Sequence, residues 1–130
     1  MLYKIGSDIC SIKRIEATYQ RFGGRFLDRI LTSGEKSYVL SRPKDFLSSV
    51  ASRFAAKEAA SKALGTGLNG VAWKEIEVVR LRSGAPTIKL HGRALQRAEY
   101  IGLTDFEVTM SHEREYAIAF VMAYGQNNRL

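Results

Sequence analysis

Residues 53–65, Arg-Phe-Ala-Ala-Lys-Glu-Ala-Ala-Ser-Lys-Ala-Leu-Gly, constrain the fold of this chain more than any other stretch. They predict the second half of a long helix that begins just after Pro43, because proline suits the first helical position. Gly65 is expected to end it, since glycine is common just after a helix C-terminus. At about 100° per residue, one face of this helix should be buried. That face carries Leu47, Val50, Ala51, Phe54 and Ser61.

Glu58 projects from the middle of the same face, about 40° from Phe54 on the helical wheel. Ionised carboxylates are seldom buried without a partner. One interpretation is an ion pair with Lys62 one turn later, in the favourable order with the acid first. The other is a site for a cation or a phosphate. The position of Glu58 on the apolar face favours the site.

The remaining segments mix short helices with antiparallel strands and lack regular β-α alternation, which predicts an α+β fold. At 130 residues the chain is expected to form a single domain, 1–130, with a frayed tail at 125–130. Strands are predicted at 2–9, 73–81, 87–90, 105–111 and 116–124. Short helices are predicted at 12–22, 25–31, 32–40 and 92–101.

The last predicted strand, 116–124, is apolar on both faces, so we expect it to be sandwiched or buried against another subunit. It is far shorter than the roughly 20 residues that a membrane-spanning helix needs. The first ten residues lack the long apolar core of a signal peptide. The single cysteine, Cys10, excludes an internal disulfide and suits a reducing compartment. These features predict a soluble cytoplasmic protein without a membrane partner.

The net charge of +7 is concentrated in the first half of the chain. Residues 1–62 carry 12 Lys and Arg against 6 Asp and Glu, whereas residues 63–130 carry 8 against 7. A basic half predicts an acidic or phosphate-bearing partner, and nucleic acid is the default candidate. The sequence has no zinc-finger spacing, arginine-rich run or basic strand interleaved with aromatics, so we expect no nucleic-acid partner.

Four further side chains admit both a structural and a functional interpretation. Asp8 follows Gly6-Ser7 at the end of the first strand, where an aspartate often caps a turn. Glu35 completes a capping box with Thr32, which would by itself explain its presence. Arg14 and Arg21 lie about 120° from the apolar face of the first helix, where they are either solvated charges or a docking surface.

Three pieces of sequence stand together in this chain. They are Gly6-Ser-Asp8-Ile9, the central Arg53-Phe-Ala-Ala-Lys-Glu-Ala-Ala-Ser-Lys62, and Ser111-His112 before the last strand. In this order and at this length they closely resemble the holo-acyl-carrier-protein synthase family, the small trimeric type of phosphopantetheinyl transferase. The resemblance extends over residues 2–124 and implies a phosphopantetheinyl transferase-like fold. The central motif is specific, whereas the Gly-x-Asp piece alone is weak.

The resemblance implies transfer of phosphopantetheine from coenzyme A to a serine of apo acyl carrier protein, in support of fatty acid synthesis. It places magnesium on Asp8 and Glu58. It places the phosphates of the coenzyme near Lys57 and Lys62, with Arg53 close by. It also implies a homotrimer whose coenzyme clefts lie between subunits. The cleft residues are Gly65, Pro86 and His112, and the carrier protein would dock on Arg14 and Arg21.

The chemistry of the residues agrees with these roles. Mg²⁺ prefers one or two carboxylates together with waters and substrate phosphates. Attack of a hydroxyl on a diphosphate needs charge neutralisation, which a metal and Lys62 would supply. A base must also take the serine proton, directly or through water. Glu58 and Glu35 are both candidates, and the resemblance favours a water-mediated role near Glu35.

Two other classes of function remain to be compared with this one. A basic nucleic-acid-binding module would explain the charge but not Glu58 on an apolar face. A non-catalytic relative that binds coenzyme A would explain the motifs but would not need both acids. An acidic carrier protein also accounts for the basic first half, and a trimer core accounts for the apolar last strand.

Overall fold

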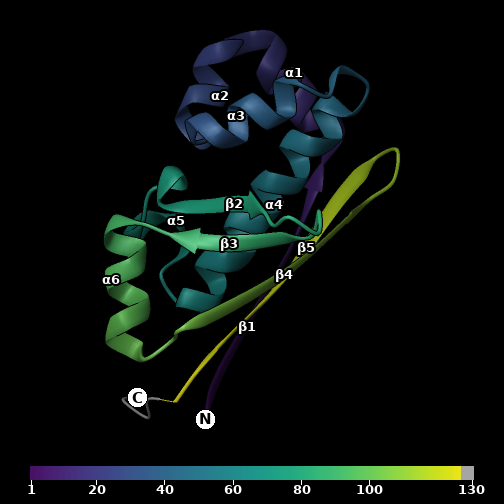
Figure 1. Ribbon diagram of the computed structural model, residues 1–130. Coiled ribbons are helices and arrows are strands. Elements are labelled where there is room, and N and C mark those ends of the chain that lie inside the picture. The colour runs from purple at the N-terminus through teal and green to yellow at the C-terminus, as the bar shows by residue number, and fades with distance from the viewer. Residues whose placement is uncertain (127–130) are drawn as a thin grey trace.

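The computed structural model describes residues 1–126 and has the predicted α+β architecture (Figure 1). Three antiparallel strands form the main sheet in the order β1 (Leu2–Ser11), β5 (Tyr116–Gly125) and β4 (Asp105–His112). The long helix α4 (Phe46–Leu64) packs on one face of this sheet. A hairpin of β2 (Ile76–Arg80) and β3 (Pro86–Leu90) packs against α4 and β4. The central helix therefore lies between the sheet and the hairpin.

The shorter helices begin and end largely where the sequence predicts. The Ser11 side chain caps the first of them, Thr32 and Glu35 form the expected capping box, and Gly65 ends α4 with φ of 77°. The predicted strand at 73–81 starts later than expected, because residues 73–75 form a 3₁₀ turn. The shorter helices and 3₁₀ turns are α1 (Ile12–Phe22), α2 (Gly24–Ile30), α3 (Ser33–Leu40), η1 (Pro43–Asp45), α5 (Gly67–Gly70), η2 (Trp73–Glu75) and α6 (Gly92–Ile101).

Small residues allow α4 and the sheet to approach closely. A Cβ added to Gly6 of β1 would overlap the carbonyl oxygen of Ala59, so only glycine fits there. The inward face of β5 is also small and fully covered. Its residues are Ala117, Ala119, Val121 and Ala123. The backbones of helix and strands thus meet with little side chain between them.

This close packing corrects the helical-wheel prediction for α4. From Val50 to Leu64 every residue is buried except Phe54, Glu58 and Lys62, which form one ridge at a spacing of four. Glu58 was expected on the buried face, and that expectation is wrong because it lies on the most open ridge. Of the five residues predicted to be buried, Val50, Ala51 and Ser61 are, whereas Leu47 and Phe54 are partly buried.

The outward face of the main sheet carries large apolar side chains that nothing in the described chain covers. Tyr3, Ile5 and Ile9 of β1 are between 55% and 63% exposed, and Tyr116, Ile118 and Phe120 of β5 between 44% and 49%. β5 is therefore covered on its inward face and open on its outward one. We call these six residues the outer sheet face.

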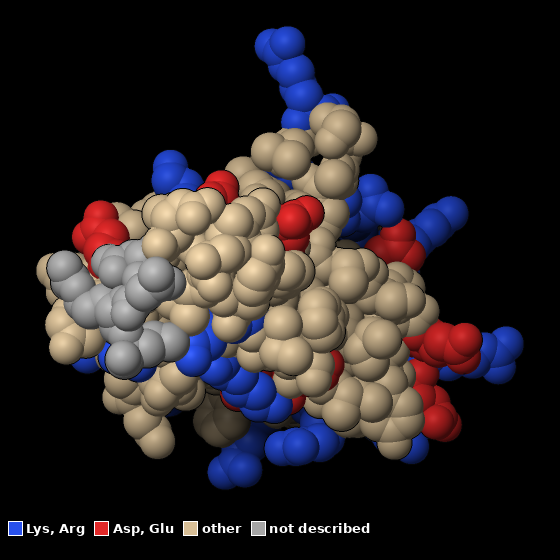
Figure 2. All heavy atoms as spheres, turned by 90° about the horizontal axis from the view of Figure 1, so that it is seen from below, with Lys and Arg blue, Asp and Glu red and all other residues tan. Residues whose placement is uncertain are grey.

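The end of β5 differs slightly from the prediction. Gly125 was expected in the frayed tail, but it pairs with Leu2 and is buried in the strand. Gln126 follows as an exposed bend, and the last four residues of the predicted tail, 127–130, lie outside the described residues. Seen from the side of the two chain ends, charged groups project mostly around the rim of a broad surface of other residues (Figure 2). No helix of residues 1–126 has the length and hydropathy to cross a bilayer.

Candidate active site

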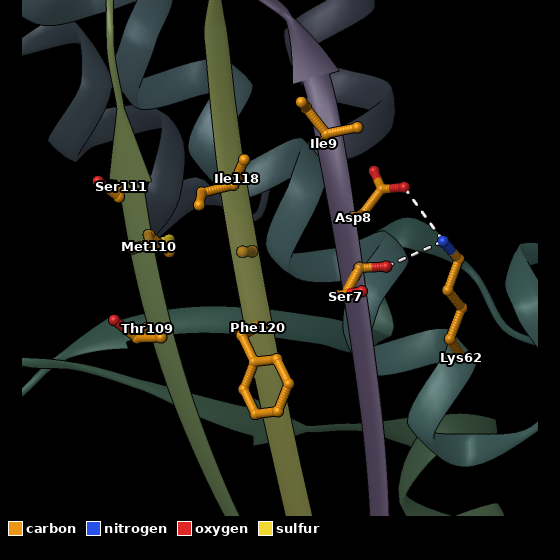
Figure 3. A pocket seen from close by; sticks show the side chains of 10 residues that line it. Ser7, Asp8, Ile9, Lys62, Thr109, Met110, Ser111, Ile118 and Phe120 are labelled. Carbon is orange, nitrogen blue, oxygen red and sulfur yellow. Dashed lines mark hydrogen bonds and ion pairs between the residues drawn. The ribbon is translucent and has the colours of Figure 1, made fainter.

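Asp8 and Lys62 meet at the edge of β1. Asp8 lies opposite Ala119 of β5, on the side of the sheet that faces α4, and its side chain is 19% exposed. Lys62 reaches past the strand edge, and its Nζ donates to the Ser7 carbonyl at 2.9 Å and to Asp8 Oδ1 at 3.2 Å (Figure 3). The alternative interpretation, an ion pair of Glu58 with Lys62, is not observed, because among the described residues the lysine pairs with Asp8.

Glu58 faces the same cavity as Asp8. The cavity is also lined by Arg14, Cys10 and Phe54. Partial burial raises the pKa of Glu58, the negative charge of Asp8 raises it further, and Lys62 opposes both. Burial and the nearby Asp8 also raise the pKa of the Cys10 thiol to about 11, so this thiol stays protonated at neutral pH. Two repelling carboxylates thus share one cavity with a single lysine beside them.

The donor set fits a magnesium ion better than a transition metal. Residues 1–126 contain no cluster of three or more His, Cys, Asp or Glu that could form a closed cage. Structural zinc usually has four protein ligands of the Cys and His type. Mg²⁺ needs only one or two carboxylates and completes its shell with waters and substrate phosphates. Asp8 and Glu58 are such a pair, on a cavity that opens to solvent.

Lys57 and Glu35 are placed differently from the sequence prediction. Both side chains have 0% exposure, and Lys57 Nζ lies 2.7 Å from Glu35 Oε1. The same ammonium donates to the carbonyls of Ile76 at 2.7 Å and Trp73 at 2.9 Å, so its three hydrogens are all used. Burial lowers the pKa of Lys57, and the glutamate opposes this change.

These contacts give both side chains a structural role and do not support the two predicted ones. Lys57 has no free donor for a phosphate, and it lies five residues from Lys62, about 140° around the helix. Glu35 also accepts hydrogen bonds from the Thr32 amide at 2.9 Å and the Val78 amide at 2.8 Å. In this chain the Glu35 carboxylate is fully buried and has no contact with solvent. Only its capping-box role is confirmed.

Arg53 belongs to a separate basic cluster. Its side chain is buried, its Nη1 donates to the Ser49 carbonyl at 3.2 Å, and its Nε has no hydrogen-bond partner among the described residues. Three guanidinium groups gather around the Tyr38 ring: Arg53 at 4.3 Å, Arg80 at 4.9 Å and Arg42 at 5.7 Å. We call these four residues the arginine cluster. It presents positive charge on a different side of α4 from Glu58.

The other predicted cleft residues are spread over the chain. Gly65 follows Lys62 by one turn, and the Arg97 Nη2 lies 3.3 Å from where its Cβ would be. Pro86 begins β3, and His112 ends β4. Pro86 and His112 do not line the cavities that contain Asp8. His112 instead lines a separate cavity, together with Lys44. One chain therefore brings Asp8, Glu58 and Lys62 together, but not Pro86 or His112.

A groove beside α1 was missed by the sequence reasoning. Arg14 and Arg21 are exposed on α1 as predicted. The groove next to them has an aromatic wall, in which the rings of Phe54 and Trp73 lie 4.6 Å apart. Its other residues are Thr18, Phe22, Arg25, Phe26, Arg29 and Ile30. Arg25 and Arg29 alternate with aromatic residues at helical spacing, and this pattern could have indicated the groove. We call this feature the aromatic groove.

Comparison with known proteins gives one consistent family. The sequence pattern of the 4'-phosphopantetheinyl transferase superfamily matches residues 4–121. The chain is 49% identical over 124 residues to the holo-[acyl-carrier-protein] synthase of Gloeobacter violaceus, covering 95% of this chain and 94% of that protein. It is 46% identical to that of Solidesulfovibrio magneticus, covering 96% and 100%.

Solved structures agree with the sequence relatives. The holo-[acyl-carrier-protein] synthase of Neisseria meningitidis superposes with a TM-score of 0.85 at 39% identity, over 95% of this chain and 99% of that one. The Helicobacter pylori enzyme, solved in complex with coenzyme A, superposes with a TM-score of 0.81 at 36% identity, over 92% and 99%.

Proposed function

The chain belongs to the 4'-phosphopantetheinyl transferase superfamily, and from that premise we infer that it converts apo to holo acyl carrier protein. A serine oxygen of the carrier bonds to the phosphorus that carries pantetheine. The bond from that phosphorus to the bridging oxygen breaks, adenosine bisphosphate leaves, and the serine loses its proton. The observation that carries this function is the meeting of Asp8, Glu58 and Lys62 in one open site. We expect the reaction in the cytoplasm, where it would supply fatty acid synthesis.

We propose that Asp8 and Glu58 hold a magnesium ion. When bound, the ion would neutralise negative charge on the diphosphate of coenzyme A. Lys62 is half exposed, so its ammonium can turn from Asp8 to a phosphate oxygen. With Glu35 buried, Glu58 is the carboxylate left to receive the serine proton, directly or through water.

We also propose that the active unit is a homotrimer with its coenzyme clefts between subunits. The outer sheet face supports an assembly, because exposed apolar surface of this kind usually marks an interface. His112, Pro86 and the arginine cluster lie away from the Asp8 cavity within one chain. A neighbouring subunit could bring them to it, and the unpartnered Nε of Arg53 would then have an anion to bind.

The decisive experiment is mass spectrometry of an apo acyl carrier protein incubated with this protein, coenzyme A and magnesium. We expect the carrier to gain the mass of one phosphopantetheine group. Glu58→Gln should abolish the gain while leaving the fold intact. If the wild type binds coenzyme A but adds no mass, a non-catalytic coenzyme-binding protein is the better description. Tight binding of DNA with a steep salt dependence would instead indicate a nucleic-acid-binding module.

Carrier recognition is proposed to use Arg14 and Arg21, which stand two turns apart on exposed α1. As a docking surface for an acidic protein, they should speed association and lose their effect at high salt. Replacing both by glutamate should raise the KM for the carrier more than about tenfold, whereas the Kd for coenzyme A stays unchanged. Added salt should slow the wild type more than the double variant. Equal carrier kinetics at low salt would make these arginines solvated charges only.

A further inference from the structure

We propose that Lys57 is a positioning residue that fixes the aromatic groove for the carrier protein and does not touch coenzyme A. The proposal rests on the proposed function and concerns how that function chooses its protein substrate. It starts from the buried ammonium of Lys57, whose three hydrogens go to Glu35 of α3 and to the carbonyls of Trp73 and Ile76.

The bonds of Lys57 determine where Trp73 lies. Residues 73–75 form the η2 turn, which leads into β2. Lys57 donates to the carbonyl at the start of this turn and to the carbonyl just after it, so both ends of the turn are tied to α4. The Trp73 ring then lies 4.6 Å from the Phe54 ring, which belongs to the turn of α4 before Lys57. One lysine thereby sets the distance between the two halves of the aromatic wall.

The aromatic groove adjoins the reaction site. Thr18, Phe26 and Phe54 line both the groove and the cavity that holds Asp8 and Glu58. Arg25 and Arg29 lie along the same groove, beside the basic α1. A carrier protein docked on α1 would therefore rest against this groove while its serine reaches Glu58. A shift of Trp73 should misplace the carrier and leave the coenzyme phosphates where they are.

Stability alone does not account for the Lys57–Glu35 pair. Replacing a buried ion pair by well-packed apolar residues is often neutral or stabilising, because both charges must be taken out of water. What an apolar pair cannot reproduce is the directional bonding of one ammonium to two backbone carbonyls. The geometry therefore assigns the pair to positioning, and its loss should be visible at Trp73.

The test uses the double variant Glu35→Gln with Lys57→Met, which removes both charges together. Trp73 is the only tryptophan of the chain, so its fluorescence reports on the groove directly. We expect a red-shifted emission and at least about twofold stronger acrylamide quenching. By isothermal titration calorimetry, the Kd for apo acyl carrier protein should rise more than about tenfold. The Kd for coenzyme A should stay within about twofold.

Lys62→Met is the matched control, since it removes the other lysine of the motif. It should raise the Kd for coenzyme A and leave Trp73 fluorescence unchanged. The proposal is overturned if the double variant loses coenzyme A affinity with no change at Trp73, or if Trp73 moves while carrier affinity stays the same. None of these readouts needs turnover, so a wild type that binds no carrier would refute the proposed function instead.

Trp73→Leu decides the matter if the double variant does not fold. This change leaves the carbonyl of residue 73 for Lys57 and removes only the aromatic wall. We expect the same selective loss of carrier affinity, more than about tenfold, with coenzyme A binding unchanged. Unaltered carrier affinity in Trp73→Leu would exclude the groove from recognition and with it the role of Lys57.

Discussion

The raised pKa of Glu58 makes the carboxylate a source of instability in the metal-free protein. Its ordinary pKa is 4.5, and burial together with Asp8 raises it in the folded state. Ionising Glu58 therefore costs more in the folded than in the unfolded chain. The loss of stability is absent below the unfolded pKa, grows as the pH rises through the two pKa values, and is complete above the folded one.

Glu58→Gln should accordingly raise the Tm of the metal-free protein at pH 7 and leave it unchanged below about pH 4. The same change should lower kcat about 100-fold or more, because it removes one of the two proposed metal ligands. Thermal denaturation from pH 4 to pH 8 in a chelator measures the first effect. A lower Tm for the variant at pH 7 would mean that Glu58 has a stabilising partner.

Lys62 forms an ion pair with Asp8, one of the two carboxylates proposed to bind the metal. Its ammonium lies 3.2 Å from Asp8 Oδ1, where its positive charge would repel a divalent ion on the same carboxylate. Lys62→Met should therefore tighten binding of Mn²⁺ or Mg²⁺ in the absence of coenzyme A, by about two- to fivefold for a partly exposed pair. Calorimetric titration of the metal measures this. Lys4→Met is the control, because Lys4 lies on the same strand as Asp8. Weaker metal binding by Lys62→Met would contradict competition between Lys62 and the metal.

At the level of single residues, the sequence pointed to two acids that the structure brings to one cavity, but not to the contacts of the lysines. Asp8 and Glu58 could be singled out through the family resemblance, which implies a metal at both. Lys57 differs, because its partner Glu35 is 22 residues away and its other two bonds go to backbone carbonyls. No periodicity predicts which carbonyls a buried ammonium will meet. The motif alone therefore suggested a phosphate contact.

At the level of elements, local signals predicted where helices begin and end but not how deeply α4 is buried. Capping by Ser11, Thr32 and Gly65 depends on nearby residues and was correctly predicted. The burial of α4 depends on distant partners. Its alanines let β1, β5 and the hairpin approach sides of the helix that a wheel assigns to solvent. The wheel therefore placed Glu58 on the wrong face.

The close approach of β1 to α4 gives a direct test of this packing. Gly6→Ala should lower the free energy of unfolding by about 3 kcal/mol, because the new methyl group would overlap the Ala59 carbonyl. Gly24→Ala is the control, since a methyl group at this position would have nothing within 4 Å, and it should change stability by less than about 1 kcal/mol. Urea denaturation measures both. Equal effects would show that α4 can move away from β1 at little cost.

For the whole molecule, we expect the outer sheet face to determine the oligomeric state. Phe120→Glu or Ile118→Glu places a charge at its centre and should convert the predicted trimer to monomers with little activity. Leu95→Glu, at a site on α6 that is 42% exposed, is the matched control and should leave assembly intact. Sedimentation velocity gives the masses. A wild-type protein that is monomeric and fully active would refute the intersubunit cleft.

The strand order has a consequence for synthesis on the ribosome. β5 is the middle strand of the sheet, yet it follows every other described element in the chain. Until it emerges, β1 and β4 have no partner between them, and the inward side of α4 stays uncovered. The nascent chain then already contains Asp8 and Glu58 but has not closed its sheet, and its unpaired strands make it prone to aggregate. A stop codon before β5 would therefore leave no partly active fragment, because the fold closes only with its last strand.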